Sequence, residues 1–374
     1  HYSGLYSGLD GHVQNMGWCG HWHRWVHLAL HPTLPAHALL GDHALLPCAG
    51  REATEQFYQS MKTEIPDFGL LLADRHKKPN QSASGGLILS SKKWKQLASQ
   101  HRERAERWTL PYRERRATGQ IHPIYDFLFI YYRNKPSQLE AWHPGHGVRL
   151  EEAPLGETFK EAYYRVENSH TSLDPSNMNE TTRHRLQMAL RLCQSVSARS
   201  PAFGCFGMHE WAMVYQGDTE NEVRHAERLP LRLSQVATDA FVRSRPIKCS
   251  HFDAFRFFSP DAKDFNRSQP SKDARLDNEQ CGCLHTNMDL YKLATQCMPW
   301  VGSELLWVCF EYALTARRLD MQASPYDCTS LGFEPIKVET SAGKLKYERQ
   351  QRSLSEAAKP LREELITRLE NILA

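Results

Sequence analysis

The sequence predicts a mainly α-helical protein of the α+β type, an irregular helical globular domain with a few short strands and a long C-terminal helix. Three observations favour this fold class. Long segments repeat apolar residues at the spacing of one helix face. Only two segments are typical of extended chain, and strands do not alternate with helices as in a parallel βαβ sheet. The sequence also lacks GxGxxG, phosphate-loop and GxSxG motifs, which argues against dinucleotide-binding, nucleotide-hydrolysing and α/β-hydrolase proteins.

The helical pattern is found in six parts of the chain. The predicted helices cover residues 91–108, 122–142, 180–199, 282–298, 303–321 and 343–374. Ser91 is the expected cap of the first, and the second divides into an apolar helix opening at His122 and a short helix from Pro136 to Trp142. Pro360 is expected to interrupt the last helix. The two segments expected to be extended are residues 229–242 and 335–340.

The chain is predicted to have three parts. Residues 1–50 hold 8 of the 19 histidines and few charged residues, and we expect a His-rich, non-globular extension or leader there. Residues 51–90 are polar and transitional, and HKKPNQSASGG within them is typical of a linker. Residues 91–374 are expected to form a single large helical catalytic domain.

Composition limits the possible partners and location. The formal net charge of +3 and the pI near 8.3 permit a polyanionic partner without requiring one. No apolar run approaches the roughly 18 to 20 residues that a membrane span needs, so no membrane partner is expected. The ten cysteines are scattered rather than arranged as a disulfide framework. We therefore expect a reducing, cytoplasmic environment, while the oligomeric state is left open.

Histidines repeatedly stand beside carboxylates in apolar surroundings between residues 205 and 330. The pairs are His209 with Glu210, His251 with Asp253, and His285 with Asp289. On a helix, His285 and Asp289 project from one face, whereas an extended chain would place His251 and Asp253 on one side. Because charged groups are rarely buried without partners, these pairs either satisfy one another or converge on a ligand.

The two cysteines upstream of His285 are not expected to bind zinc. Structural zinc sites draw their ligands from two separated pairs. Cys281, Cys283 and His285 are too close together for that pattern, and no second pair stands out.

Several motifs resemble a protein family common in actinomycetes. The segments are GCFGMHEWAMVY, LPLRLSQVATDAFV, CSHFDAFRFFSPDA, GCLHTNMDLYK, RRLDMQASPYD and HPIYDFLFIYYRNKPSQLEAWHPG. Members of this family are frequently labelled 3-methyladenine DNA glycosylase. The resemblance runs from about Trp94 to about Leu365, with the motifs in the same order. Family members tend to read PGCLH where this chain has Cys281, and the first 90 residues have no counterpart.

The resemblance implies a DNA base-excision N-glycosylase that acts on alkylated bases and needs no cofactor. Such an enzyme holds a flipped base between aromatic rings and stabilises a positive sugar with a carboxylate. The expected catalytic residues are Asp253 and Asp289, with His251 and His285 tuning them. The expected substrate-binding residues are Trp211, Arg232, Arg256, Tyr291, Lys292 and Tyr326.

Two other functions stay open. The first is a metal-dependent hydrolase or iron oxidoreductase acting on a small substrate, with zinc, iron or manganese as the cofactor. Its expected ligands are His209, Glu210, His251, His285 and Asp289. The second is a non-catalytic binding protein in which the polar pairs are structural.

Overall fold

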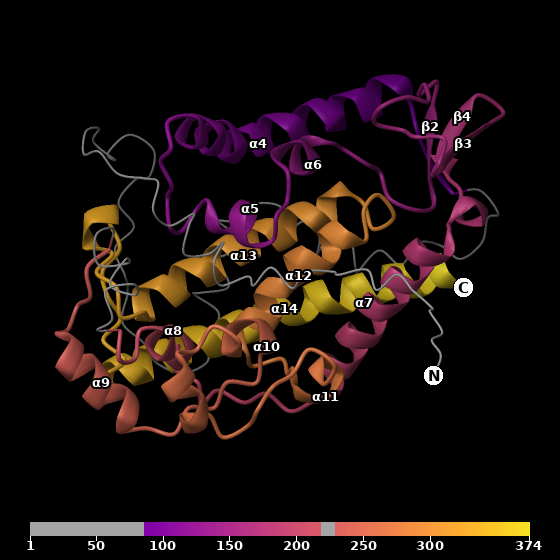
Figure 1. Ribbon diagram of the computed structural model, residues 1–374. Helices are drawn as coiled ribbons and strands as arrows, with labels where there is room; N and C mark the ends of the chain where they lie inside the picture. The colour runs from indigo at the N-terminus through magenta and orange to yellow at the C-terminus, as the bar shows by residue number, and fades with distance from the viewer. Residues whose placement is uncertain (1–85, 218–228) are drawn as a thin grey trace, which may run out of the picture.

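The fold is mainly α-helical, as predicted. The computed structural model of the protein describes residues 86–217 and 229–374. Figure 1 shows three long helices in the middle of the body, α12 (Leu284–Gln296), α13 (Ser303–Ala323) and α14 (Ser341–Leu373). α4 (Ser91–Ala117) lies along one side of them, and a small sheet lies at one end.

The core is built around α13. Nearly all of its side chains are buried, because α12 packs along it and α14 covers it further. α14 in turn packs against α7 (Glu180–Ala198). Leu305, Val308 and Phe310 are fully buried, and removing such side chains from water stabilises the fold by about 1.5–3 kcal/mol each. These long helices form the support on which shorter elements place the polar residues.

A four-stranded sheet has the order β1-β2-β4-β3. Its strands are β1 (Leu87–Leu89), β2 (Val148–Glu151), β3 (Tyr164–Glu167) and β4 (His170–Leu173). β1 pairs with β2 in parallel, and the other pairs are antiparallel. The β3–β4 hairpin turns at Asn168 and Ser169, which both have positive φ, as a two-residue type I′ turn requires. β1 falls in the stretch expected to be a linker.

Short helices connect the long ones. They are α5 (Phe127–Tyr131), α6 (Pro136–Glu140), α8 (Met208–Met213), α9 (Gln235–Arg243), α10 (Phe252–Phe255) and α11 (Arg275–Asn278). Three 3₁₀ turns cover Pro175–Asn177, Pro260–Phe265 and Thr329–Leu331. Most of the histidines and carboxylates singled out above lie on these short helices or beside them.

The prediction of extended chain is wrong for both segments, 229–242 and 335–340. In residues 229–242, Leu231 makes a single bridge to Tyr326, and α9 then begins after Ser234, whose hydroxyl accepts from the Ala237 N–H at 3.3 Å. Residues 335–340 form no strand, although Ile336 and Val338 are buried alternately. Burial with a period of two indicates a strand only where another strand lies alongside to pair with it.

The predicted helices exist, but several boundaries differ. Ser90, not Ser91, caps α4, and the helix continues through Pro111 to Ala117. The apolar helix expected from His122 is limited to the five residues of α5. α14 is not interrupted at Pro360, because residues on both sides of it, including Ala358 and Leu361, are buried against the core.

Two further expectations concern the ends of the chain and membranes. The His-rich extension at residues 1–50 and most of the stretch 51–90 lie outside the described residues. None of the helices within 86–217 and 229–374 combines the length and apolar character that crossing a bilayer requires.

Candidate functional site

Three side chains from three helices meet in what we call the first triad: His209, His285 and Asp320. α8 carries His209, the first turn of α12 carries His285, and the last turn of α13 carries Asp320. His209 Nε2 lies 2.8 Å from Asp320 Oδ1, and His285 Nε2 lies 3.8 Å from Asp320 Oδ2. One ligand-type atom of each residue lies within 4.8 Å of those of the others, so the three could hold a metal ion.

A second triad consists of His251, Glu279 and Asp289. His251 precedes α10, Glu279 follows α11, and Asp289 lies one turn after His285 on α12. His251 Nε2 lies 3.3 Å from Asp289 Oδ2 and 3.8 Å from Glu279 Oε1. These atoms also fit within 4.8 Å of one another. All six residues of the two triads are buried.

The two triads are in contact through their imidazoles. The ring centroids of His209 and His285 lie 4.4 Å apart, and those of His251 and His285 lie 5.5 Å apart. α12 joins the triads as well, since it supplies His285 to one and Asp289 to the other. The histidines and acids of segments far apart in the sequence therefore form one buried polar cluster.

The charged groups of the first triad strongly shift one another's pKa values. Burial opposes ionisation of Asp320, but the charges of His209 and Arg317 and the hydrogen bond from His209 together outweigh it, and the pKa of Asp320 lies well below its usual range. The same pair raises the pKa of His209, because the attraction of Asp320 exceeds the cost of burial. Burial, with the charge of His209 nearby, lowers the pKa of His285 to about 3. His285 is therefore the neutral imidazole of this triad.

Arg317 holds Asp320 from the other side. Its Nη1 donates to Asp320 Oδ2 at 2.6 Å and to Glu210 Oε1 at 2.9 Å. Burial raises the pKa of Glu210, although the Arg317 charge opposes this shift. Glu210 therefore faces Arg317 rather than the histidines, and it is not among the ligand-type groups of either triad.

Two cations already occupy the second triad. Arg275 donates to Glu279 Oε1 at 2.5 Å and to Asp289 Oδ2 at 3.0 Å. Lys292 Nζ lies 3.6 Å from Asp289 Oδ2 and 2.9 Å from Asp253 Oδ2. Burial alone would raise the pKa of Asp289. The contributions of Lys292, His251 and Arg275 together outweigh it, so the pKa of Asp289 lies well below its usual range.

Asp289 also has a phenolic partner. Tyr132 Oη donates to Asp289 Oδ1 at 2.9 Å. Burial, helped by the Asp289 charge, raises the pKa of Tyr132, which keeps the phenol as a donor.

Cysteines surround the histidines without joining either triad. Cys205 Sγ lies 3.5 Å from His209 Nδ1, the ring nitrogen that does not face Asp320. Cys281 donates to the Arg199 carbonyl, and burial raises the pKa of the Cys283 thiol to about 11. No cysteine belongs to a group of three ligand-type side chains among the described residues.

The histidine–carboxylate neighbours in sequence do not pair with each other. His209 contacts Asp320 instead of Glu210, His251 contacts Asp289 instead of Asp253, and His285 lies nearest to Asp320. His251 itself is extended, but Asp253 lies within α10, so the two side chains do not share one side of a strand. Asp253 is instead held by Lys292 and by Arg256, whose Nε lies 3.3 Å from it.

The aromatic residues expected to bind substrate lie mainly in the core. Trp211 is fully buried and donates to the Ala323 carbonyl, and Tyr291 is 1% exposed. Tyr326 is buried as well. Their burial does not support a role in stacking on a substrate.

The expected substrate-binding cations differ in position. Arg232 forms a bidentate ion pair with Glu339 and lies over the Trp211 ring, and it makes no hydrogen bond to either triad among the described residues. Arg256 and Lys292 lie beside Asp253 and retain about a fifth of their side-chain exposure. Of the three, only Arg256 and Lys292 adjoin the polar cluster.

The site includes residues that the sequence pattern did not single out as ligands or partners. They are Cys205, Arg275, Glu279, Arg317 and Asp320. Asp320 lies 111 residues from His209, so no local spacing connects them. A useful signal was available in the helix pattern, since Arg317 and Asp320 are three apart on the buried face of α13.

No protein-family model matches the chain, and comparisons with curated proteins and with solved structures give no significant match either. The likeness to proteins labelled 3-methyladenine DNA glycosylase therefore stays a prediction. The function is inferred below from the geometry of the two triads.

Proposed function

We propose that the protein is a metal-dependent enzyme whose ion is held by His209, His285 and Asp320. The observation that carries the proposal is the position of His285. Its imidazole is 6% exposed, lies beside two other ligand-type groups, and makes no hydrogen bond to the described residues. A metal ion would use the free lone pair of this neutral imidazole.

The first triad suits an ion better than the second. In the second triad, Arg275 donates to both carboxylates, and Lys292 adds another positive charge. A metal ion there would have to displace or repel these cations. The first triad holds one cation instead of two: Arg317 donates to Asp320 Oδ2, while Asp320 Oδ1 is hydrogen-bonded only to His209 among the described residues.

The donor set limits the chemistry. Two imidazoles and one carboxylate, with positions left for other ligands, suit zinc and non-haem iron. When bound, such an ion supplies activation of water or, for iron, of oxygen. Arg317, which is itself held by Glu210, orients Asp320, as outer hydrogen bonds do in metal sites. We therefore expect a hydrolase or an iron oxidoreductase, and the identity of the metal decides between them.

Metal content tests the proposal directly. We expect protein purified without chelators, or reconstituted with Fe²⁺, Zn²⁺ or Mn²⁺, to retain about one equivalent of a transition metal. His285→Ala and Asp320→Asn each remove one ligand, so each should lose most of that metal. Elemental analysis after gel filtration measures it.

Two controls sharpen the result. His251→Ala changes the second triad and should keep the metal, whereas His184→Ala changes an exposed histidine on α7 and should have no effect. Folded wild-type protein that retains no metal after reconstitution contradicts the proposal. Equal metal content in His285→Ala and wild-type protein does so too.

A second candidate function rests on Asp253. This carboxylate keeps 16% of its side-chain exposure and adjoins Tyr131, whose Oη lies 3.4 Å from the Asp253 carbonyl. Tyr131 is stacked on Phe127. Burial opposes ionisation of Asp253, but Lys292 and His251 together lower its pKa. An ionised carboxylate beside aromatic rings and cations is what an N-glycosylase needs to stabilise a positive sugar.

Base release from alkylated DNA tests this second candidate. We expect release of a methylated base to fall at least about a hundredfold in Asp253→Asn if this carboxylate stabilises the sugar cation. Asp261→Asn, which changes an exposed carboxylate nearby, serves as the matched control. Release by the chelator-treated enzyme would favour the glycosylase over the metal enzyme. No release and no DNA binding at low salt would reject the glycosylase.

A further inference from the structure

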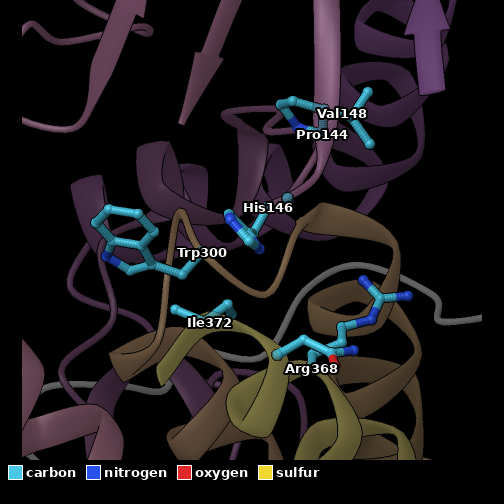
Figure 2. Close-up of a pocket in the computed structure, with 8 residues that line it drawn as sticks. Pro144, His146, Val148, Trp300, Arg368 and Ile372 are labelled. Atoms are coloured by element: carbon cyan, nitrogen blue, oxygen red, sulfur yellow. The ribbon is translucent and has the colours of Figure 1, made fainter. Parts of the chain in front are cut away.

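A small pocket lies away from both triads and shares no residue with them. Its volume is about 200 Å³, and its lining residues are Pro144, Gly145, His146, Val148, Trp300, Arg368, Asn371 and Ile372. Figure 2 shows His146, Trp300, Ile372 and Arg368 arranged around it, with Pro144 and Val148 on one side. Three parts of the fold form the walls: the turn before β2, the turn between α12 and α13, and the last turns of α14.

The two turns are fixed against each other. The His146 N–H donates to the Trp300 carbonyl at 2.9 Å, and the Ser303 N–H donates to the His143 carbonyl at 2.9 Å. Gly145 and Gly302 both have φ near +80° to +86°, and a Cβ on Gly145 would lie 3.2 Å from the Gly302 Cα. Glycine allows this close approach. The pocket is therefore built before any ligand arrives.

Two hydrogen bonds hold the Arg368 side chain in place, and they leave some of its N–H groups available to a ligand. Its Nη1 donates to the Val301 carbonyl at 2.5 Å, and its Nε donates to Glu364 Oε1 at 2.8 Å. Nη2 donates no hydrogen bond within the described residues. A guanidinium has five N–H donors in a rigid plane, and that plane suits the two oxygens of a carboxylate.

The other polar groups of the pocket add donors but no opposing charge. Burial lowers the pKa of His146, so its ring is neutral at pH 7 and carries one N–H. None of the described residues that line the pocket is acidic, and the nearest carboxylate to Arg368 is its partner Glu364, outside the lining. Pro144, Val148 and Ile372 supply apolar surface.

We propose that this pocket binds a small monocarboxylate, with its carboxylate group on Arg368 and its hydrocarbon part against Val148, Trp300 and Ile372. The pocket is smaller than the roughly 300–1,000 Å³ of typical drug-sized sites, so the ligand is a compact one. A tetrahedral dianion such as phosphate fits less well, because a single arginine would balance it and the apolar walls would lie against a hydrated ion.

Binding of benzoate to the full chain tests the proposal. We expect saturable binding by isothermal titration calorimetry, and benzamide, the neutral analogue of the same shape, should bind at least about tenfold more weakly. Arg368→Gln should weaken benzoate binding by a similar factor. Arg352→Gln is the matched control, because Arg352 also pairs with a glutamate four residues earlier on α14 but lies outside the pocket.

A second variant tests the proposal even if Arg368→Gln does not fold. Asn371 is exposed, so Asn371→Glu should fold and should repel a carboxylate from the pocket. Equal affinity for benzoate and benzamide overturns the proposal, and so does unchanged benzoate affinity in either pocket variant. Tighter binding of inorganic phosphate than of benzoate overturns the assignment to a carboxylate.

Discussion

Arg317 lies between two buried carboxylates, Glu210 and Asp320, and is itself only 4% exposed. Its guanidinium carbon lies 3.9 Å from the centroid of the Phe127 ring, which adds a cation–π contact. Isolated charges in a protein interior are very costly. The arginine therefore allows the carboxylate of the first triad to stay ionised without contact with water.

Removal of this arginine should destabilise the protein strongly. We expect Arg317→Met to lower the free energy of unfolding by about 3–5 kcal/mol, because Glu210 and Asp320 lose their partner. Adding Glu210→Gln should restore part of the loss. Urea denaturation measures both. Arg352→Met removes an exposed pair with Glu348 and should cost no more than about 1 kcal/mol. A similar loss in the two arginine variants would contradict this account.

At the scale of elements, the sequence predicted the helices with strong periodicity, and α5 and α6, but missed the short helices α8 to α11. α7 and α13 were expected almost at their observed bounds, because apolar residues repeat regularly and Asn179 or Gly302 marks the start. The strands of the sheet have three or four residues each, too few for a period of two to be distinguished from chance. Alternation misled the prediction in residues 229–242, where Ser234 starts a helix.

For the candidate site, the sequence predicted residues but not how they pair. His209, His251, His285 and Asp289 were expected from the sequence, and the structure brings all four into one cluster. The pairing between them was not predictable from spacing, because each histidine contacts an acid from another element. Local spacing indicates which side chains share a helix face, but packing of α8 and α13 decides which faces meet.

On the scale of the whole molecule, buried neutral histidines are spread through the fold. Burial lowers the pKa values of His101, His122 and His143 to about 4 each. His101 shows how a neutral ring is held: its Nε2 donates to the Leu139 carbonyl at 2.7 Å, and its Nδ1 accepts from Arg104. In the unfolded chain these rings have pKa values near 6.5.

These histidines predict a fall in stability with acidification. Their contribution is complete above pH 6.5 and is lost as the pH falls to about 4, because the unfolded chain binds protons that the folded protein does not. Each contributes a slope of up to about 1.4 kcal/mol per pH unit within that window.

Urea denaturation at pH 7 and pH 5 measures the effect. We expect His101→Gln to reduce the difference between the two pH values, whereas His184→Gln, an exposed change on α7, should leave it unaltered. Equal stability of the wild-type protein at both pH values would show that the buried rings do not control this range.

α12 gives His285 to one triad and Asp289 to the other, four residues further along the same helix. A helix advances about 1.5 Å and turns about 100° with each residue. Insertion or deletion of a single residue between the two would swing one of them to a different side of the helix. Natural variants of this chain can therefore change length in the loops around α12, but not within the turn that separates these two side chains.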